Sequence, residues 1–153
     1  MAGGADDKNT AQAGELNMAV AFPYCSDTLP LERVAVDCWE GEVDPRYANG
    51  FEGVLVGQFG GWTAAALLKA AIGEAQPGQH PRALVVHFIS AVRPGLFSIR
   101  TRCLRQGRGV AFWQVDMAQG EDVRATATVT VGETRADASS YAFAKVPEAP
   151  HPE

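Results

Sequence analysis

Two adjacent glycines, Gly60 and Gly61, carry the clearest chemical signal in the sequence. They open an apolar segment, residues 62–71, whose only polar side chains are Thr63 and Lys69. A helix over this segment would begin with glycine where Ser, Asp or Asn usually caps the first backbone N–H groups. Uncapped N–H groups at the positive end of a helix dipole can hold a carbonyl oxygen or an oxyanion. The alternative is that the glycines only let the helix pack closely against a strand.

Acidic residues precede the glycine pair, in a segment (residues 40–58) that is rich in glycine and acids. A carboxylate near an electrophilic carbonyl can act as a general base toward water. Glu52 is the acid nearest the glycines, and its apolar neighbours would raise its pKa toward a useful range. Asp44 is the second candidate, and Gln58 is a neutral alternative whose amide can orient a water. The alternatives are a solvated acidic loop for the acids and simple loop hydrogen bonding for Gln58.

Aromatic, histidine and arginine side chains are the candidates for substrate binding. Phe59 and Trp62 flank the glycines and are placed to line a channel, although aromatic packing in a core gives the same pattern. His87 lies among apolar residues, where a histidine is more often a hydrogen-bonded core or interface residue than a base. Arg105 and Arg108 bracket a turn and are placed to bind phosphate groups. Exposed arginines at turns are usually only solvated.

Composition excludes several classes of protein. The 153 residues suffice for one domain with a single core. A net charge of −5 argues against general nucleic-acid binding, and no apolar run approaches the roughly 20 residues that cross a bilayer. Cys25, Cys38 and Cys103 form no CxxC pair and no cluster with histidine, so we expect no metal site and no cofactor. Free thiols suit a reducing cytoplasm, and Cys38 and Cys103 lie in apolar runs that predict burial.

One helix and a set of strands must position these residues. The apolar segment predicts a helix from the glycine pair to about Glu74. Residues 33–39 alternate well enough for a first strand, and residues 83–90 are so continuously apolar that they predict a central strand. Three further strands, joined by turns, alternate apolar and polar residues: Leu96–Leu104, Val110–Ala118 and Val123–Val131.

These elements predict an α+β domain. An antiparallel sheet curved around the helix is the economical arrangement, because only that covers an apolar helix on most sides. We place the domain at residues 31–135. Residues 1–30 are predicted to be a flexible tail, and residues 136–153 a proline-rich tail with linker character.

Five short motifs keep a fixed order and spacing between about Arg33 and Gly132. They are Gly60-Gly61-Trp62-Thr63-Ala64-Ala65-Ala66-Leu67, His80-Pro81 followed by Val85-Val86-His87-Phe88, Arg93-Pro94-Gly95, Leu104-Arg105-Gln106-Gly107-Arg108 and Ala125-Thr126-Ala127-Thr128. Together they resemble the acyl-CoA thioesterase II-like family, and more narrowly its N-terminal hot-dog domain. The resemblance implies a hot-dog fold, in which an antiparallel sheet wraps a central buried helix, and an acyl-CoA ligand.

The sequence also departs from that family. Its members usually carry two hot-dog domains, with a catalytic Asp at the start of the second domain's helix and an assisting Thr and Gln on neighbouring strands. The equivalent region here, residues 60–62, has no acid, and Thr128 falls near the strand position of the family's Gln. A lone hot-dog domain leaves sheet edges unpaired, and the apolar segment Val85–Ile89 is a candidate edge. We therefore expect a homodimer or a higher homo-oligomer.

Three functions remain open at this point. The first is an acyl-CoA thioesterase, in which water attacks a thioester whose carbonyl oxygen is held by the backbone N–H groups of residues 60–62. The second is a binding module that holds acyl-CoA or another acyl thioester without hydrolysing it. The third is a hot-dog dehydratase or hydratase, which ranks last because His87 has no evident acidic partner.

Overall fold

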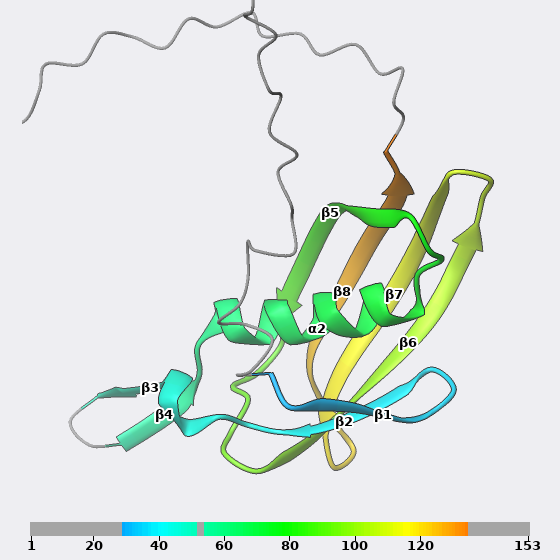
Figure 1. The fold of residues 1–153 in the computed structure, drawn as a ribbon. Coiled ribbons are helices and arrows are strands. Elements are labelled where there is room, and N and C mark those ends of the chain that lie inside the picture. Colours follow the sequence, from blue (N-terminus) through cyan, green and yellow to red (C-terminus); the bar gives the residue numbers. More distant parts are fainter. Residues whose placement is uncertain (1–28, 52–53, 135–153) are drawn as a thin grey trace, which may run out of the picture.

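The computed structural model describes residues 29–51 and 54–134. They form one α-helix, a short 3-10 turn and two antiparallel sheets (Figure 1). In chain order the elements are β1 Leu31–Ala35, β2 Cys38–Glu42, η2 Pro45–Tyr47, β3 Ala48–Phe51, β4 Val54–Gln58, α2 Gly60–Glu74, β5 Gln79–Phe88, β6 Leu96–Gln106, β7 Val110–Gln119 and β8 Asp122–Glu133.

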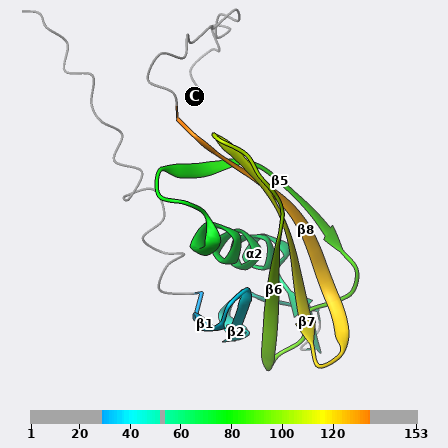
Figure 2. The same ribbon diagram turned by 90° about the vertical axis from the view of Figure 1, so that its right-hand side faces the viewer.

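The large sheet has the strand order β1-β2-β6-β7-β8-β5, and β3 and β4 form a separate hairpin. The sheet is strongly curved, so that α2 lies in its concave side with β1 and β2 curling beneath the helix (Figure 2). The predicted helix and the three long strands after residue 95 are confirmed, and all three strands extend by one to three residues beyond the predicted bounds. The predicted antiparallel sheet around a helix is therefore present.

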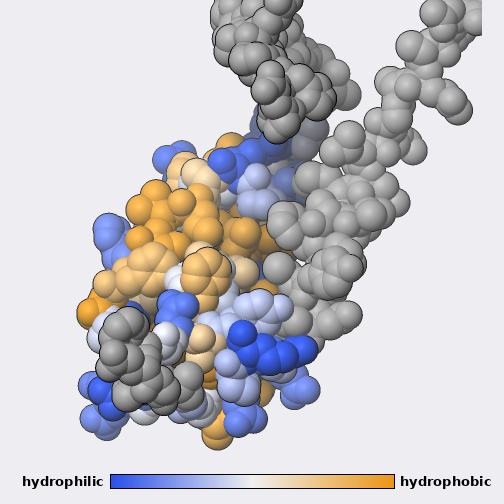
Figure 3. All heavy atoms as spheres, turned by 90° about the vertical axis from the view of Figure 1, so that its left-hand side faces the viewer, coloured by the Kyte–Doolittle hydropathy of each residue, from blue (hydrophilic) through white to orange (hydrophobic). Residues whose placement is uncertain are grey.

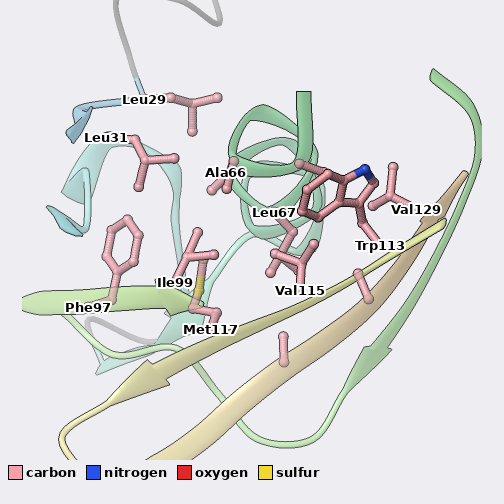
Figure 4. Packing of buried hydrophobic residues seen from close by; sticks show 14 of the residues in the cluster. Leu29, Leu31, Ala66, Leu67, Phe97, Ile99, Trp113, Val115, Met117 and Val129 are labelled. Atoms are coloured by element: carbon pink, nitrogen blue, oxygen red, sulfur yellow. The ribbon is translucent and has the colours of Figure 1, made fainter. Parts of the chain in front are cut away.

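The core lies between the inner face of the sheet and one face of α2 (Figure 4). Alternation along β6, β7 and β8 sends every second side chain toward the helix, as the sequence pattern predicts. The helix contributes Trp62, Thr63, Ala66, Leu67, Ala70 and Ala71. The strands contribute Phe97, Ile99, Thr101, Ala111, Trp113, Val115, Met117, Ala125, Ala127, Val129 and Val131.

The single strand predicted over residues 33–39 is wrong. The chain turns at Val36 and Asp37, so β1 and β2 form a hairpin. Asp37 has a φ of 58°, in the left-handed region that aspartate tolerates better than most residues. The segment predicted to be irregular, residues 40–58, likewise contains the end of β2, the η2 turn and the β3–β4 hairpin.

The central position predicted for residues 83–90 is also wrong, because β5 is an edge strand that pairs only with β8 among the described strands. The alternative expectation, that Val85–Ile89 is a sheet edge, agrees with this strand order. Leu84 and Val86 point inward and are half-buried, whereas Val85 and His87 are exposed. The continuous apolar run therefore marks a strand with an uncovered outer face. It does not mark a strand held between two layers.

Two predictions of burial need correction. The outer side of α2 is only partly covered by described residues, and Ile72 is 41% exposed. Cys103 is exposed and Cys38 is half-buried, although both were expected to be buried. Cys103 stands beside a register shift in β6, beyond the last residue of β6 that pairs with β2, so one side of the strand is open there.

Cys25 and both predicted tails lie outside the described residues, apart from Leu29 and Pro30.

Candidate active site

The N-terminus of α2 has no side-chain cap. Phe59 occupies the N-cap position, and its carbonyl oxygen accepts from the N–H groups of Trp62 at 3.0 Å and Thr63 at 3.2 Å. The N–H groups of Gly60 and Gly61 have no acceptor within the described part of the chain. The expectation of three free donors is thus corrected to two, because the helix itself uses the N–H of Trp62. Both remaining donors lie at the positive end of a 15-residue helix.

Two aromatic rings flank these donors. Phe59 is 54% exposed, and its ring lies beside Gly61, where an added β-carbon would stand 2.5 Å from the ring atom Cε1. Phe88, at the end of β5, is 58% exposed and lies beside Gly60, with 3.3 Å from an added β-carbon to Cζ. Figure 3 views this side of the molecule and shows hydrophobic residues gathered on it. The two glycines therefore keep the backbone close to an exposed apolar surface.

Gln58 is buried directly before the helix. Its backbone N–H donates to the carbonyl oxygen of Val92 at 2.8 Å, and its side-chain Nε2 donates to the carbonyl oxygen of Asp44 at 3.0 Å. The next backbone N–H, that of Phe59, donates to the carbonyl oxygen of Tyr47 at 2.8 Å. The bonds to Asp44 and Tyr47 tie the η2 turn to the start of α2, and the bond to Val92 ties the end of β4 to the connection between β5 and β6.

The carboxylate of Asp44 is engaged by Arg46. The Nε and Nη2 atoms of Arg46 approach the two oxygens of Asp44 at 3.0 and 2.7 Å, and the backbone N–H of Arg46 donates to Oδ1 at 2.9 Å. The side-chain hydrogen bond from Arg46, followed by the backbone hydrogen bond, holds the pKa of the Asp44 carboxyl below its ordinary value. Asp44 is thus a weaker base than an unpaired aspartate.

Trp62 points into the core rather than along an open channel. It is only 5% exposed, and its ring packs edge-on against Phe97 with 5.5 Å between centroids and 82° between planes. Of the two aromatic residues that the sequence placed at a channel, Phe59 and Trp62, only Phe59 is exposed. Glu52, the first carboxylate candidate, lies outside the described residues.

The structure does not bring the other candidate residues to the helix N-terminus. His87 and Thr128 are exposed on the outer face of the sheet, opposite the helix, because they alternate with the inward residues of β5 and β8. Arg105 pairs with Phe112 near the end of β6, and Arg108 lies in the following hairpin. When the strand pairings are followed across the sheet, Phe88 and Arg105 are offset by five residues along the strand direction, about 16 Å at 3.3 Å per residue. Arg105 is therefore distant from the helix N-terminus, which Phe88 contacts.

Two residues near the site escaped sequence reasoning. The contact of Phe88 with Gly60 joins segments 28 positions apart, and no local pattern signals it. The role of Arg46 could have been predicted, since Asp-Pro at positions 44–45 is typical of a helical N-terminus, where Asp accepts from a following N–H.

Within the described residues no group of three or more His, Cys, Asp or Glu side chains could hold a metal ion, and no helix is long and apolar enough to cross a membrane.

The family model of the acyl-CoA thioesterase N-terminal domain matches residues 51–132, more than half of the chain. The chain therefore belongs to this family. No curated protein matches it. The family and the neighbouring solved structures support a thioesterase-like function.

Solved structures confirm the hot-dog fold. A protein of unknown function from Alicyclobacillus acidocaldarius, described as having a hot-dog fold, is 30% identical with a TM-score of 0.70, over 84% of this chain and 46% of that one. A putative thioesterase II from Thermobifida fusca is 25% identical with a TM-score of 0.71, over 82% and 45%. The acyl-CoA thioesterase II TesB2 from Mycobacterium marinum, at 19% identity and a TM-score of 0.65, matches over 84% and 44% and shows the fold alone. The chain spans less than half the length of these three proteins.

Proposed function

We propose that this chain hydrolyses an acyl-CoA thioester whose carbonyl oxygen is held at the N-terminus of α2. The observation that carries the proposal is the pair of unpartnered N–H groups at Gly60 and Gly61, beside an exposed apolar surface. Membership of a family described as acyl-CoA thioesterase supports the same substrate class. Two preorganised donors of this kind stabilise the charge that develops on the oxygen during attack.

The reaction adds water to the thioester carbonyl carbon. The carbonyl oxygen becomes an oxyanion that accepts hydrogen bonds from Gly60 and Gly61, and the C–S bond then breaks to release the carboxylic acid and the thiol of coenzyme A. A carboxylate from the segment before the helix takes the proton from water. Glu52 is the preferred base, because the pairing of Asp44 with Arg46 weakens that second candidate.

A second copy of the chain is part of the proposal. The outer edge of β5 has no partner among the described strands, and Val85 and Phe88 on this strand and Ile89 directly after it are each more than half exposed. We call these three residues the β5 edge patch. Pairing of two β5 edges would cover it, and the matching proteins from Alicyclobacillus acidocaldarius and Thermobifida fusca have chains about twice as long, with room for a second unit. The cytoplasmic location inferred from the free cysteines remains a prediction.

The second candidate function is non-catalytic binding of acyl-CoA. The observation that favours it is the Asp44–Arg46 ion pair, since the described carboxyl that precedes the helix most closely is already engaged. Incubation of the purified chain with acyl-CoAs of several chain lengths and a thiol-trapping reagent separates the two functions. Release of the thiol supports hydrolysis, whereas binding without release supports the binding module.

A further inference from the structure

The helix α2 has an apolar face on the side opposite the core. At about 100° per residue, Ala64, Ala65, Leu68 and Ile72 lie on one face, and the buried residues of the helix lie on the other. The first three are half-buried, and Ile72 is 41% exposed. We call these four residues the outer α2 stripe. A helix face that meets water normally carries charged and polar side chains, so the stripe indicates an apolar cover.

The described chain enters the domain beside this stripe. Lys69 is the only charged side chain from Gly60 to Gly73, and its Nζ atom donates to the backbone carbonyl oxygen of Leu29 at 2.7 Å. Leu29 and Leu31 are 5% and 8% exposed and belong to the core, and Figure 4 shows Leu29 beside the helix. The residues that precede Leu29 therefore start from the middle of α2.

Two contacts give the direction in which this segment runs along α2. Leu29 meets Lys69, and four residues later Arg33 meets Glu74, with 2.6 Å from Nη2 to Oε2. Both residue numbers increase together, so the segment and the helix run the same way. Followed backwards from Leu29, the chain therefore leads toward Ala64. Ala64 is five residues before Lys69, about 7.5 Å at 1.5 Å per residue, a distance that three extended residues span.

The chain before Leu29 carries large apolar side chains at every second position, namely Leu16, Met18, Val20, Phe22 and Tyr24. This alternation gives an extended segment one apolar face. Pro23 has no backbone N–H, so it suits a segment laid on a helix better than one paired within a sheet. Tyr24 is five residues before Leu29, a reach of about 17 Å, which exceeds the distance to Ala64.

We propose that residues 20–28 pack along the outer α2 stripe and cover its N-terminal part, from Ala64 to Leu68. Phe22 and Tyr24 supply the apolar contacts. Residues 20–28, for which composition predicts a flexible tail, thereby become part of the domain. The cover comes from the same chain, because Lys69 already holds that chain beside the stripe and closing so short a loop costs little entropy. This inference is independent of the hydrolase function.

The test measures how fast a thiol on the stripe is alkylated in the full chain. Ala64→Cys places a small thiol there, and mass spectrometry of peptides separates it from the native cysteines. Phe22→Ser together with Tyr24→Ser should raise its alkylation rate by about tenfold, because loss of the apolar contacts lets the segment open more often. The matched control, Tyr141→Ser with Phe143→Ser, removes another pair of aromatic residues two positions apart and should leave the rate unchanged.

Cys38, half-buried on β2, reports unfolding of the whole domain and should keep its alkylation rate in every variant. An unchanged rate at Ala64→Cys after the loss of Phe22 and Tyr24 would overturn the proposal. A rate that rises with Tyr141→Ser and Phe143→Ser would overturn it too, since another segment would then be the cover. A rate that rises on dilution of the protein would overturn it in favour of a second copy. If Ala64→Cys does not fold, Ala65→Cys decides by the same comparison.

Discussion

The ring of Phe88, at the end of β5, lies against the backbone of Gly60, at the first residue of α2: a β-carbon added to Gly60 would stand 3.3 Å from Phe88 Cζ. This contact joins the unpaired edge of the sheet to the helix N-terminus. A second copy paired along β5 would therefore lie beside the two unpartnered N–H groups. The proposed dimer interface and the proposed active site are then neighbours.

Gly61→Val should lower turnover while the protein stays folded. Gly61 is exposed, so the added side chain disturbs no core packing, but it blocks approach to the backbone donors. Loss of one oxyanion donor typically costs roughly 2.7–4 kcal/mol of barrier, so kcat should fall about 100-fold or more. Steady-state kinetics and circular dichroism check both halves of the prediction.

The control for this variant concerns the ring of Phe59, which a β-carbon at Gly61 must displace. Phe59→Ala removes the ring without touching the donors and should retain most of kcat. If Phe59→Ala loses as much activity as Gly61→Val, the effect belongs to the ring. Unchanged kcat in folded Gly61→Val would count against the oxyanion role.

The chain should be a dimer in solution, and lysines on the β5 edge patch should break it. Val85→Lys together with Ile89→Lys places two charges on an edge that pairing would cover. Light scattering at micromolar concentration should give the mass of two chains for the parent and of one for the variant. Leu96→Lys, on a strand three positions away in the sheet and 76% exposed, should leave the dimer intact. A monomeric parent would contradict the prediction.

Asp44→Asn should destabilise the fold at neutral pH but not in strong acid. The pKa of Asp44 is lowered from 3.8 by its hydrogen bonds with Arg46, so the folded state binds fewer protons than the unfolded state around that pH. The contribution of the ion pair is therefore complete above pH 3.8 and disappears as the pH falls through the lower value of the folded state. Melting temperatures of parent and variant should converge in acid. A difference that does not change with pH would show that the charge of Asp44 is not involved.

Glu52→Ala should lower kcat if this carboxylate is the base. A general base contributes on the order of 10²–10⁴-fold, and its removal should also abolish the acid limb of the pH–rate profile. Asp44→Ala should have the smaller effect, since Arg46 already engages that carboxylate. Glu40→Ala, on β2, is the control for loss of one negative charge. Equal rates for Glu52→Ala and the parent would move the base to another residue.

Sequence patterns predicted those parts of this structure that depend on local periodicity. The helix from Gly60 to Glu74 and the faces of β6, β7 and β8 follow from spacing alone. For β5 the sequence supported two conflicting positions, a central strand from its apolar run and a candidate edge at Val85–Ile89, because a run of apolar residues is equally consistent with a buried strand and with an edge that awaits a partner. The turn at Asp37 was missed because its flanking residues keep alternating through it.

The candidate site was predicted only in part, for the same reason. The uncapped glycines are a local feature and were found, whereas the contact of Phe88 with Gly60 depends on the path of the chain after the helix. Thr128 was chosen by resemblance to a family position, although strand alternation directs it to the outer face. A residue carried over from a family must also satisfy the face on which its strand places it.

Thiol release from acyl-CoA by the purified chain tests the central claim most directly. Acyl-CoAs of several chain lengths are incubated with the parent and with Gly61→Val in the presence of a thiol-trapping reagent, and the protein alone serves as the blank because Cys103 is exposed. The account predicts that the parent releases coenzyme A from at least one acyl-CoA well above the uncatalysed rate, and that Gly61→Val reduces this release about 100-fold. Binding of acyl-CoA by the parent without any release of thiol would contradict the hydrolase function and establish the binding module in its place.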